Sequence, residues 1–119
     1  MQPESKDAAY LWDMLDAERA IQKFVLSRSF EDYGSDRMLR GAVERHLEII
    51  GEAANRVSRE FHAAHPEIPW QRIIGQRNVL THEYGEIDGA LIWRVVTARI
   101  PELISQLERI MPPLPREDR

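Results

Sequence analysis

The chain has 119 residues, of which 43% are hydrophobic and 30% are charged, and it contains no cysteine. This length suits one ordinary domain, so we expect residues 1–119 to form a single domain with loosely ordered ends at about 1–6 and 113–119. The lack of cysteine excludes a disulfide scaffold, a zinc ribbon, a thiol nucleophile and a thiolate iron–sulfur site. The net charge of −4 speaks against nucleic-acid binding through bulk positive charge.

The amino-terminal residues 1–7 are polar and are not followed by the apolar stretch of a signal peptide. The chain also lacks a continuous run of about eighteen apolar residues, the length needed to span a membrane as a helix. We therefore expect a cytoplasmic protein that does not act in a membrane.

Two long helices are predicted in the first half of the chain. Hydrophobic residues recur at intervals of three and four from Asp7 to Leu26, which is typical of an amphipathic helix. A polar break over 27–34 follows, and Asp36 or the serine before it can cap a second helix. The apolar spacing then continues to about Ala64, and Pro66 ends the helix because the residue before a proline avoids the α conformation.

Two more helices are predicted in the second half. A third helix begins near Pro69, which suits a first turn, and it fades at Gly85. Asp88 can cap a fourth helix, in which Pro101 should cause a kink because it lacks a backbone donor and crowds the preceding turn. The proline-rich run 112–115 ends that helix.

The sequence shows no strict alternation of apolar and polar residues long enough for a strand. Helices joined by short connections favour an all-α fold, an antiparallel bundle of four to five helices with a kinked last helix. We interpret Trp12, Trp70 and Trp93 as anchors of the core or of an interface.

The sequence offers little support for a metal centre. A di-iron helical bundle uses Glu-x-x-His on two helices, and this pattern does not occur here. His62 and His65 are spaced to share one helix face, but no carboxylate stands at helical spacing to complete a site. We interpret them as histidines at an exposed, fraying helix end, and we expect neither a metal nor a cofactor.

The segment from Arg77 to Tyr84 is the part of the chain whose composition does not fit a purely structural role. It combines a guanidinium, the Asn78 amide, a hydroxyl, the His82 imidazole and a phenol within eight residues. On a straight helix Arg77 and Tyr84 share one face, whereas Arg77 and His82 lie about 140° apart. These two converge only if the helix ends near Thr81 or if a second subunit completes the site.

An arginine and a histidine together suit metal-free cleavage of RNA. The guanidinium binds a phosphodiester through two charge-assisted hydrogen bonds, and an imidazole moves protons near neutral pH. The ribose 2′-hydroxyl would attack the adjacent phosphorus while one group accepts its proton and another protonates the leaving oxygen. A two-fold dimer would bring both proton carriers to one cleft. The alternative is a structural pair, with a histidine that caps a helix and an arginine in an ion pair.

The motif Arg77-x4-His82-x-Tyr84 resembles the Arg-x4-His-x-Tyr signature of the HepT toxins of the HEPN superfamily. The block Ile49-Ile50-Gly51-Glu52-Ala53-Ala54 and the tripeptide Ile68-Pro69-Trp70 also resemble that family. The resemblance covers roughly Ala8 to Ile110.

The resemblance implies a helical homodimer with the motif facing a shared cleft, and a toxin that cleaves RNA. It implies that Arg77 and His82 are the catalytic pair and that Asn78 supports them. It also implies a partner, an MNT-type nucleotidyltransferase antitoxin, which transfers AMP to Tyr84. The added phosphate would neutralise the cation and occupy the place of the RNA backbone.

Two alternatives remain open from the sequence. The chain could be a non-catalytic helical module that docks a nucleotidyltransferase and presents a nucleotide or substrate, or it could be a plain structural dimer. Glu83 and Glu86 flank the motif, so we expect modest, salt-sensitive affinity for RNA.

Overall fold

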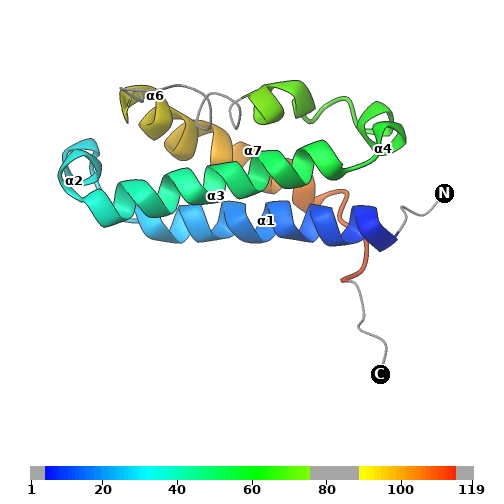
Figure 1. Ribbon diagram of the computed structural model, residues 1–119, viewed down its shortest axis with the longest axis horizontal. Coiled ribbons are helices and arrows are strands. Elements are labelled where there is room, and N and C mark those ends of the chain that lie inside the picture. The colour runs from blue at the N-terminus through cyan, green and yellow to red at the C-terminus, as the bar shows by residue number, and fades with distance from the viewer. Residues whose placement is uncertain (1–4, 76–88, 115–119) are drawn as a thin grey trace.

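The computed structural model describes residues 5–75 and 89–114. Within these ranges the ordered elements are helical and no strand is present, which confirms the predicted all-α fold (Figure 1). In chain order the elements are α1 (Ser5–Val25), α2 (Phe30–Ser35), α3 (Arg37–Arg56), α4 (Arg59–Ala64), a helical segment over 70–75, α6 (Gly89–Arg94), the π-helix η1 (Val95–Arg99) and α7 (Ile100–Glu108).

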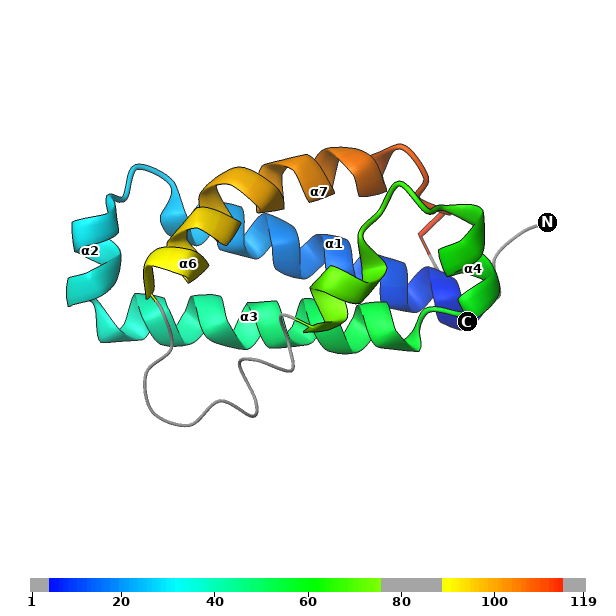
Figure 2. The same cartoon turned by 90° about the horizontal axis from the view of Figure 1, so that it is seen from above.

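The long helices lie side by side, and α1 runs opposite to both α3 and α7 (Figures 1 and 2). The helices α6, η1 and α7 follow one another as a nearly continuous rod, of which η1 and α7 lie along α1 whereas α6 packs against α2. The short helices α2 and α4 close opposite ends of the bundle, and the segment 70–75 lies over α3. This is the antiparallel arrangement predicted from the sequence.

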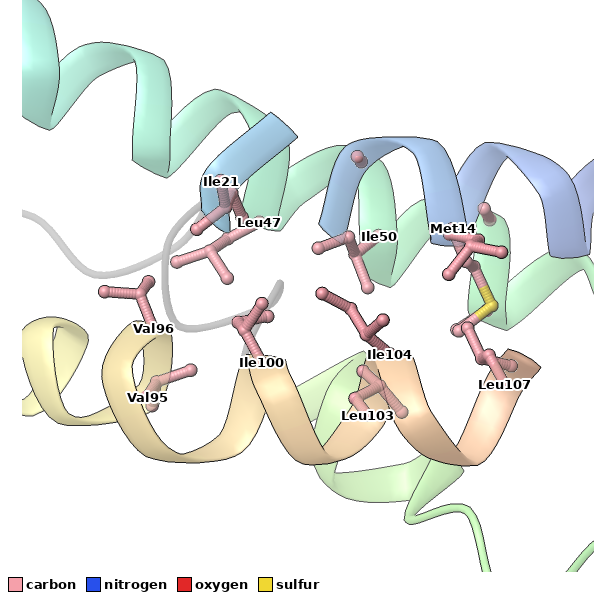
Figure 3. Close-up of a cluster of buried hydrophobic side chains, with 14 of the residues drawn as sticks. Met14, Ile21, Leu47, Ile50, Val95, Val96, Ile100, Leu103, Ile104 and Leu107 are labelled. Atoms are coloured by element: carbon pink, nitrogen blue, oxygen red, sulfur yellow. The ribbon is translucent and has the colours of Figure 1, made fainter. Parts of the chain in front are cut away.

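The core lies where α1, α3 and α7 meet. Figure 3 shows Met14 and Ile21 of α1, together with Leu47 of α3, facing Ile100 and Ile104 of the α7 rod. All five side chains are buried. Burying one such side chain contributes roughly 1.5–3 kcal/mol relative to exposure, so this apolar contact is the main source of stability.

A short helix, α2, replaces part of the break predicted between the first two long helices. Ser29 caps it: its hydroxyl accepts a hydrogen bond from the Asp32 N–H at 3.1 Å, and the Asp32 carboxylate accepts from the Ser29 N–H at 2.9 Å. This reciprocal pair is a capping box, which satisfies two otherwise unpaired backbone donors. As predicted, Asp36 caps α3, since its carboxylate accepts from the Leu39 N–H at 3.0 Å.

The predicted single helix to Ala64 is wrong, because the chain leaves the helical conformation at Val57 (φ −62°, ψ 140°). Ser58 then caps α4, and its hydroxyl accepts from the Phe61 N–H at 3.2 Å. The break is held from α1: the buried Asp7 carboxylate accepts from the Ser58 N–H at 2.9 Å and from its hydroxyl at 2.6 Å. A partner 51 residues away is invisible to local periodicity.

The disturbance predicted at Pro101 takes the form of a π-helix. Five residues, Val95–Arg99, precede α7, and the Ile100 N–H donates to the Val95 carbonyl. Pro101 cannot donate to the carbonyl four residues earlier and crowds it, so a wider turn relieves the contact.

Both tails of the chain extend beyond the described residues, which exclude 1–4 and 115–119. Helix α1 begins at Ser5, two residues before the predicted start, and residues 111–114 are not helical. The Trp12 indole N–H donates to the Pro112 carbonyl at 3.2 Å and ties this tail to α1. Among the described helices, none has the length and apolar character needed to cross a membrane.

Candidate functional site

The four residues predicted to form the site, Arg77, Asn78, His82 and Tyr84, lie outside the described residues. Their mutual arrangement therefore stays a prediction, as do the helix stop at Gly85 and the cap at Asp88. The structure describes both flanks of the motif, the helical segment 70–75 on one side and α6 on the other.

The amino-terminal flank begins where the sequence predicts a helix start. The Pro69 carbonyl accepts from the Ile73 N–H at 3.0 Å, which places Pro69 at the cap of the segment 70–75. Trp70 is buried, and its indole N–H donates to the His65 carbonyl at 3.0 Å. The first residue of the helix that leads to the motif is thus fixed to the end of α4.

The interpretation of His62 as an exposed side chain at a fraying helix end is wrong. His62 is only 9% exposed, and its ring stacks on Trp70 with centroids 4.3 Å apart and an interplanar angle of 18°. Its Nε2 lies 2.9 Å from the Ala54 carbonyl oxygen, so Nε2 carries the proton. Burial lowers the pKa of His62 below its ordinary value of 6.5, which favours the neutral ring.

His65 does not join His62 in a polar cluster. Its Nδ1 lies 3.3 Å from the Glu67 Oε2, and its side chain is 28% exposed. Within the described parts of the chain, no three His, Asp or Glu side chains gather as a metal would require.

The carboxyl-terminal flank, α6, is packed against α2. The Trp93 ring lies 5.5 Å from the Tyr33 ring and 6.5 Å from the Phe30 ring, measured between centroids. Burial raises the pKa of Tyr33 to about 12, so its phenol stays neutral. Each flank of the motif is therefore anchored by a tryptophan that packs against neighbouring rings.

A cavity of about 270 Å³ lies beside the amino-terminal flank. Apolar side chains line most of it, with charged and amide groups among them. The lining residues come from α3 (Leu47, Ile50), from the chain that leads into and includes the segment 70–75 (Glu67, Pro69, Arg72, Ile73) and from η1 and α7 (Val95, Arg99, Ile100, Glu102, Leu103, Gln106).

The polar side chains of this cavity differ in whether they form hydrogen bonds or ion pairs. Gln106 donates to the Glu67 carbonyl at 3.2 Å, which ties α7 to the opposite wall. Arg72, Arg99 and Glu102 are exposed, and none of them hydrogen-bonds or pairs with another described residue. Two unpaired guanidinium groups therefore stand on the lining of one cavity. Their role was not predictable from the sequence, because lone arginines on helices carry no local signal.

Glu18 is a second feature that was not predicted from the sequence. It is fully buried in α1, and within the described structure neither carboxyl oxygen has a hydrogen-bond partner. Burial raises its pKa to about 9, with Arg19 lowering and Glu108 raising it to a smaller extent. Its position three residues before Ile21 and four after Met14 puts it on the apolar face, which is a signal that the sequence does contain.

Comparison with known proteins shows which family this helical bundle is similar to. The family model described as HepT-like ribonuclease matches residues 14–110. A probable ribonuclease HepT of Thermococcus cleftensis is 38% identical over 101 residues, which cover 85% of this chain and 92% of that protein. A candidate RNase of Methanocaldococcus jannaschii is 34% identical over 100 residues, 84% of this chain and 92% of that protein. No solved structure matches the chain with statistical significance.

An all-α bundle in which both flanks of an Arg-His-Tyr motif are anchored, one at the end of α4 and the other against α2, fits a HEPN-type ribonuclease. The chain belongs to the HepT-like ribonuclease family, because the family match covers most of its length and includes the motif and both flanks. The family resemblance found in the sequence is therefore confirmed.

Proposed function

We propose that this protein is a metal-independent endoribonuclease, the toxin of a toxin–antitoxin pair, with Arg77 and His82 as its catalytic residues. The observation that carries the proposal is the series Arg77-x4-His82-x-Tyr84 in a chain of the HepT-like ribonuclease family. Guanidinium and imidazole groups supply charge stabilisation and proton transfer without a metal.

The proposed reaction is an intramolecular transesterification. Neutral His82 accepts the proton of the ribose 2′-hydroxyl, and the 2′-oxygen forms a bond to the adjacent phosphorus. The bond to the 5′-oxygen breaks, and a protonated imidazole, His82 of the second copy, donates a proton to that leaving oxygen. Arg77 stabilises the charge on the pentacoordinate phosphorane, and Asn78 orients the reacting groups. The products carry a 2′,3′-cyclic phosphate and a 5′-hydroxyl.

This chemistry requires a homodimer, because one chain supplies one motif histidine and the reaction uses two proton carriers. Each general acid or base contributes roughly 10²- to 10⁴-fold to the rate. Losing either carrier should therefore be far more damaging than losing an exposed residue elsewhere.

The direct test is cleavage of RNA by the purified protein in EDTA. Wild type should cleave, whereas His82→Ala and Arg77→Ala should lose at least about a hundredfold in rate. His65→Ala and Arg59→Ala serve as matched controls, since neither residue belongs to the motif, and their rates should stay close to wild type. Cleavage that survives His82→Ala, or that requires a divalent metal, contradicts the proposal. An inert wild type that binds a nucleotidyltransferase tightly would instead support the non-catalytic module.

The proposed regulation is AMP transfer to Tyr84 by an MNT-type nucleotidyltransferase. Co-expression with such an enzyme should add the mass of one or more AMP groups to the peptide that contains Tyr84. The Tyr84→Phe variant should show no added mass and should keep its ribonuclease activity in the presence of the partner. AMP on another residue, or inhibition that persists in Tyr84→Phe, contradicts this regulation.

A further inference from the structure

We propose that the cavity between the segment 70–75, α3 and α7 binds one nucleotide of the RNA substrate, with its phosphate on Arg72 and Arg99. This inference rests on the proposed ribonuclease function, and it adds a substrate-binding subsite outside the catalytic motif.

The shape and lining of the cavity suit a small ligand. Its volume of about 270 Å³ is close to the lower end of ordinary ligand pockets, which suits a ligand of a few ring systems. Leu47 and Ile50 of α3, Val95 of η1 and Leu103 of α7 supply an apolar floor. Such pockets typically join an apolar floor to a few placed polar groups, as this one does.

Two positive charges from different elements stand at this cavity. Arg72 and Arg99 lie 27 residues apart in sequence, on different elements, yet both line the same cavity. Their guanidinium groups have no ion-pair partner among the described residues, although the chain as a whole carries a net charge of −4. A planar guanidinium matches two oxygens of a phosphodiester.

Two acidic residues on the lining favour a nucleotide over a bare phosphate. Glu67 and Glu102 line the same cavity as the arginines; the Glu67 carboxylate is paired with His65, whereas the Glu102 carboxylate has no partner among the described residues. They repel a second anionic group and accept N–H donors, which the edge of a nucleobase provides. A ligand with one phosphate, a flat apolar ring system and N–H donors fits all three parts of the lining.

The cavity is close in sequence to the catalytic motif, so its ligand can be part of a substrate strand. Arg72 precedes Arg77 by five residues, and five residues of chain span at most roughly 18 Å. A strand held at the cavity is therefore within a few nucleotides of the catalytic arginine. A subsite at this distance would hold RNA in register for cleavage without touching the reacting atoms.

The experiment measures binding of the full-length protein to a fluorescent oligoribonucleotide whose 2′-hydroxyls are methylated. Methylation removes the attacking group, so binding is measured without cleavage. The test variants are Arg72→Gln and Arg99→Gln, which keep the aliphatic stem of the side chain. Arg37→Gln is the matched control, because Arg37 is exposed on α3 and does not line the cavity.

Each test variant should weaken binding by about tenfold, and Arg37→Gln should not. The slope of log Kd against log salt should fall by about 0.7 for each cavity arginine. An abasic oligonucleotide of equal length should bind more weakly to wild type, because the apolar floor contacts a base. Equal losses in all three variants, or equal binding of the abasic strand, would overturn the proposal, since both indicate diffuse electrostatic attraction.

Cleavage of unmodified RNA separates this inference from the proposed function. Arg72→Gln and Arg99→Gln should raise KM and leave kcat within a few-fold of wild type, because the subsite binds ground state and transition state alike. If wild type cleaves RNA but these variants keep its KM, the subsite is wrong and the ribonuclease stands. If wild type does not cleave, the ribonuclease fails, and so does the assignment of this ligand as substrate. Thermal melting of each variant checks that the fold is intact.

Discussion

The imidazole of His62 stacks on the indole of Trp70 with ring centroids 4.3 Å apart. The pair joins α4 to the first residue of the segment 70–75, and the His62 Nε2–H also donates to the Ala54 carbonyl of α3. Three elements therefore meet at one contact, and the chain continues from it toward Arg77. This contact fixes where the amino-terminal flank of the motif begins.

Replacing Trp70 tests this anchor. Trp70→Ala removes a buried indole and should lower the free energy of unfolding by roughly 3–5 kcal/mol, seen as a fall in Tm of about 10 °C or more. Trp70→Phe keeps a ring against His62 and should cost clearly less. Equal losses in the two variants would show that the ring stack contributes nothing beyond the indole hydrogen bond to His65.

His62 should make the fold sensitive to mild acid. Burial lowers its pKa below 6.5, so the unfolded chain binds more protons than the folded chain in this range. Its contribution to stability is fully present above about pH 6.5 and is lost as the pH falls below that value. Denaturant unfolding of wild type and His62→Gln at several pH values measures this. The difference between their stabilities should change between pH 7 and pH 5, and a constant difference would contradict the account.

Glu18 should change the free energy of unfolding with pH in the opposite direction to His62. Its folded pKa of about 9 lies above the ordinary 4.5, so its contribution is fully present below pH 4.5 and is lost as the pH rises toward 9. By pH 7 the loss is roughly 3 kcal/mol, because each pH unit above 4.5 costs about 1.4 kcal/mol. Glu18→Met and Glu18→Gln remove the ionisable group and should both flatten this decline, and Glu18→Met should also raise stability at pH 8.

The control for Glu18 is Gln22→Met, at an exposed and uncharged position on the same helix. It should leave the pH dependence unchanged. If Glu18→Gln retains the wild-type pH dependence, the Glu18 carboxyl ionises in the folded protein as it does in water. Its side chain is then not buried in the protein in solution.

Glu18 and His62 show what a helical pattern does and does not predict. The stripe of α1 predicts its apolar core residues correctly, and the same register places Glu18 among them, so the burial of this acid was predictable. The burial of His62 was not, because it depends on Trp70, which returns to α4 after a turn at Pro66. A histidine three residues from a second histidine looks like a surface pair until that turn is known.

The cap of α4 is a separate test of the break after α3. Ser58→Ala removes the hydroxyl that bonds the Phe61 N–H and the Asp7 carboxylate, and it should cost about 1–2 kcal/mol. Asp7→Ala should cost at least as much, since it leaves the Ser58 N–H without its partner. Ser105→Ala, at an exposed position inside α7, should be neutral or slightly stabilising. A neutral Ser58→Ala would contradict the capping role.

The break between α3 and α4 also shows where the spacing of apolar residues fails to predict the fold. Val57 and Phe61 continue the apolar spacing of α3, so the pattern alone predicts one helix where the structure has two. The Asp36 cap and the helix start at Trp70 were predictable because their signals, a capping aspartate and a proline, are local. The cavity arginines were not, because Arg72 and Arg99 meet only through the packing of distant elements.

The most direct measurement of the central claim is the chemical structure of the RNA ends after cleavage in EDTA. An account in which His82 accepts the 2′-hydroxyl proton predicts a 2′,3′-cyclic phosphate on one product and a 5′-hydroxyl on the other. A substrate with a single 2′-deoxy sugar at the cleaved position should resist cleavage there. Products with a 5′-phosphate, or cleavage at the 2′-deoxy position, would show that water rather than the neighbouring hydroxyl attacks the phosphorus, and the proposed roles of Arg77 and His82 would be wrong.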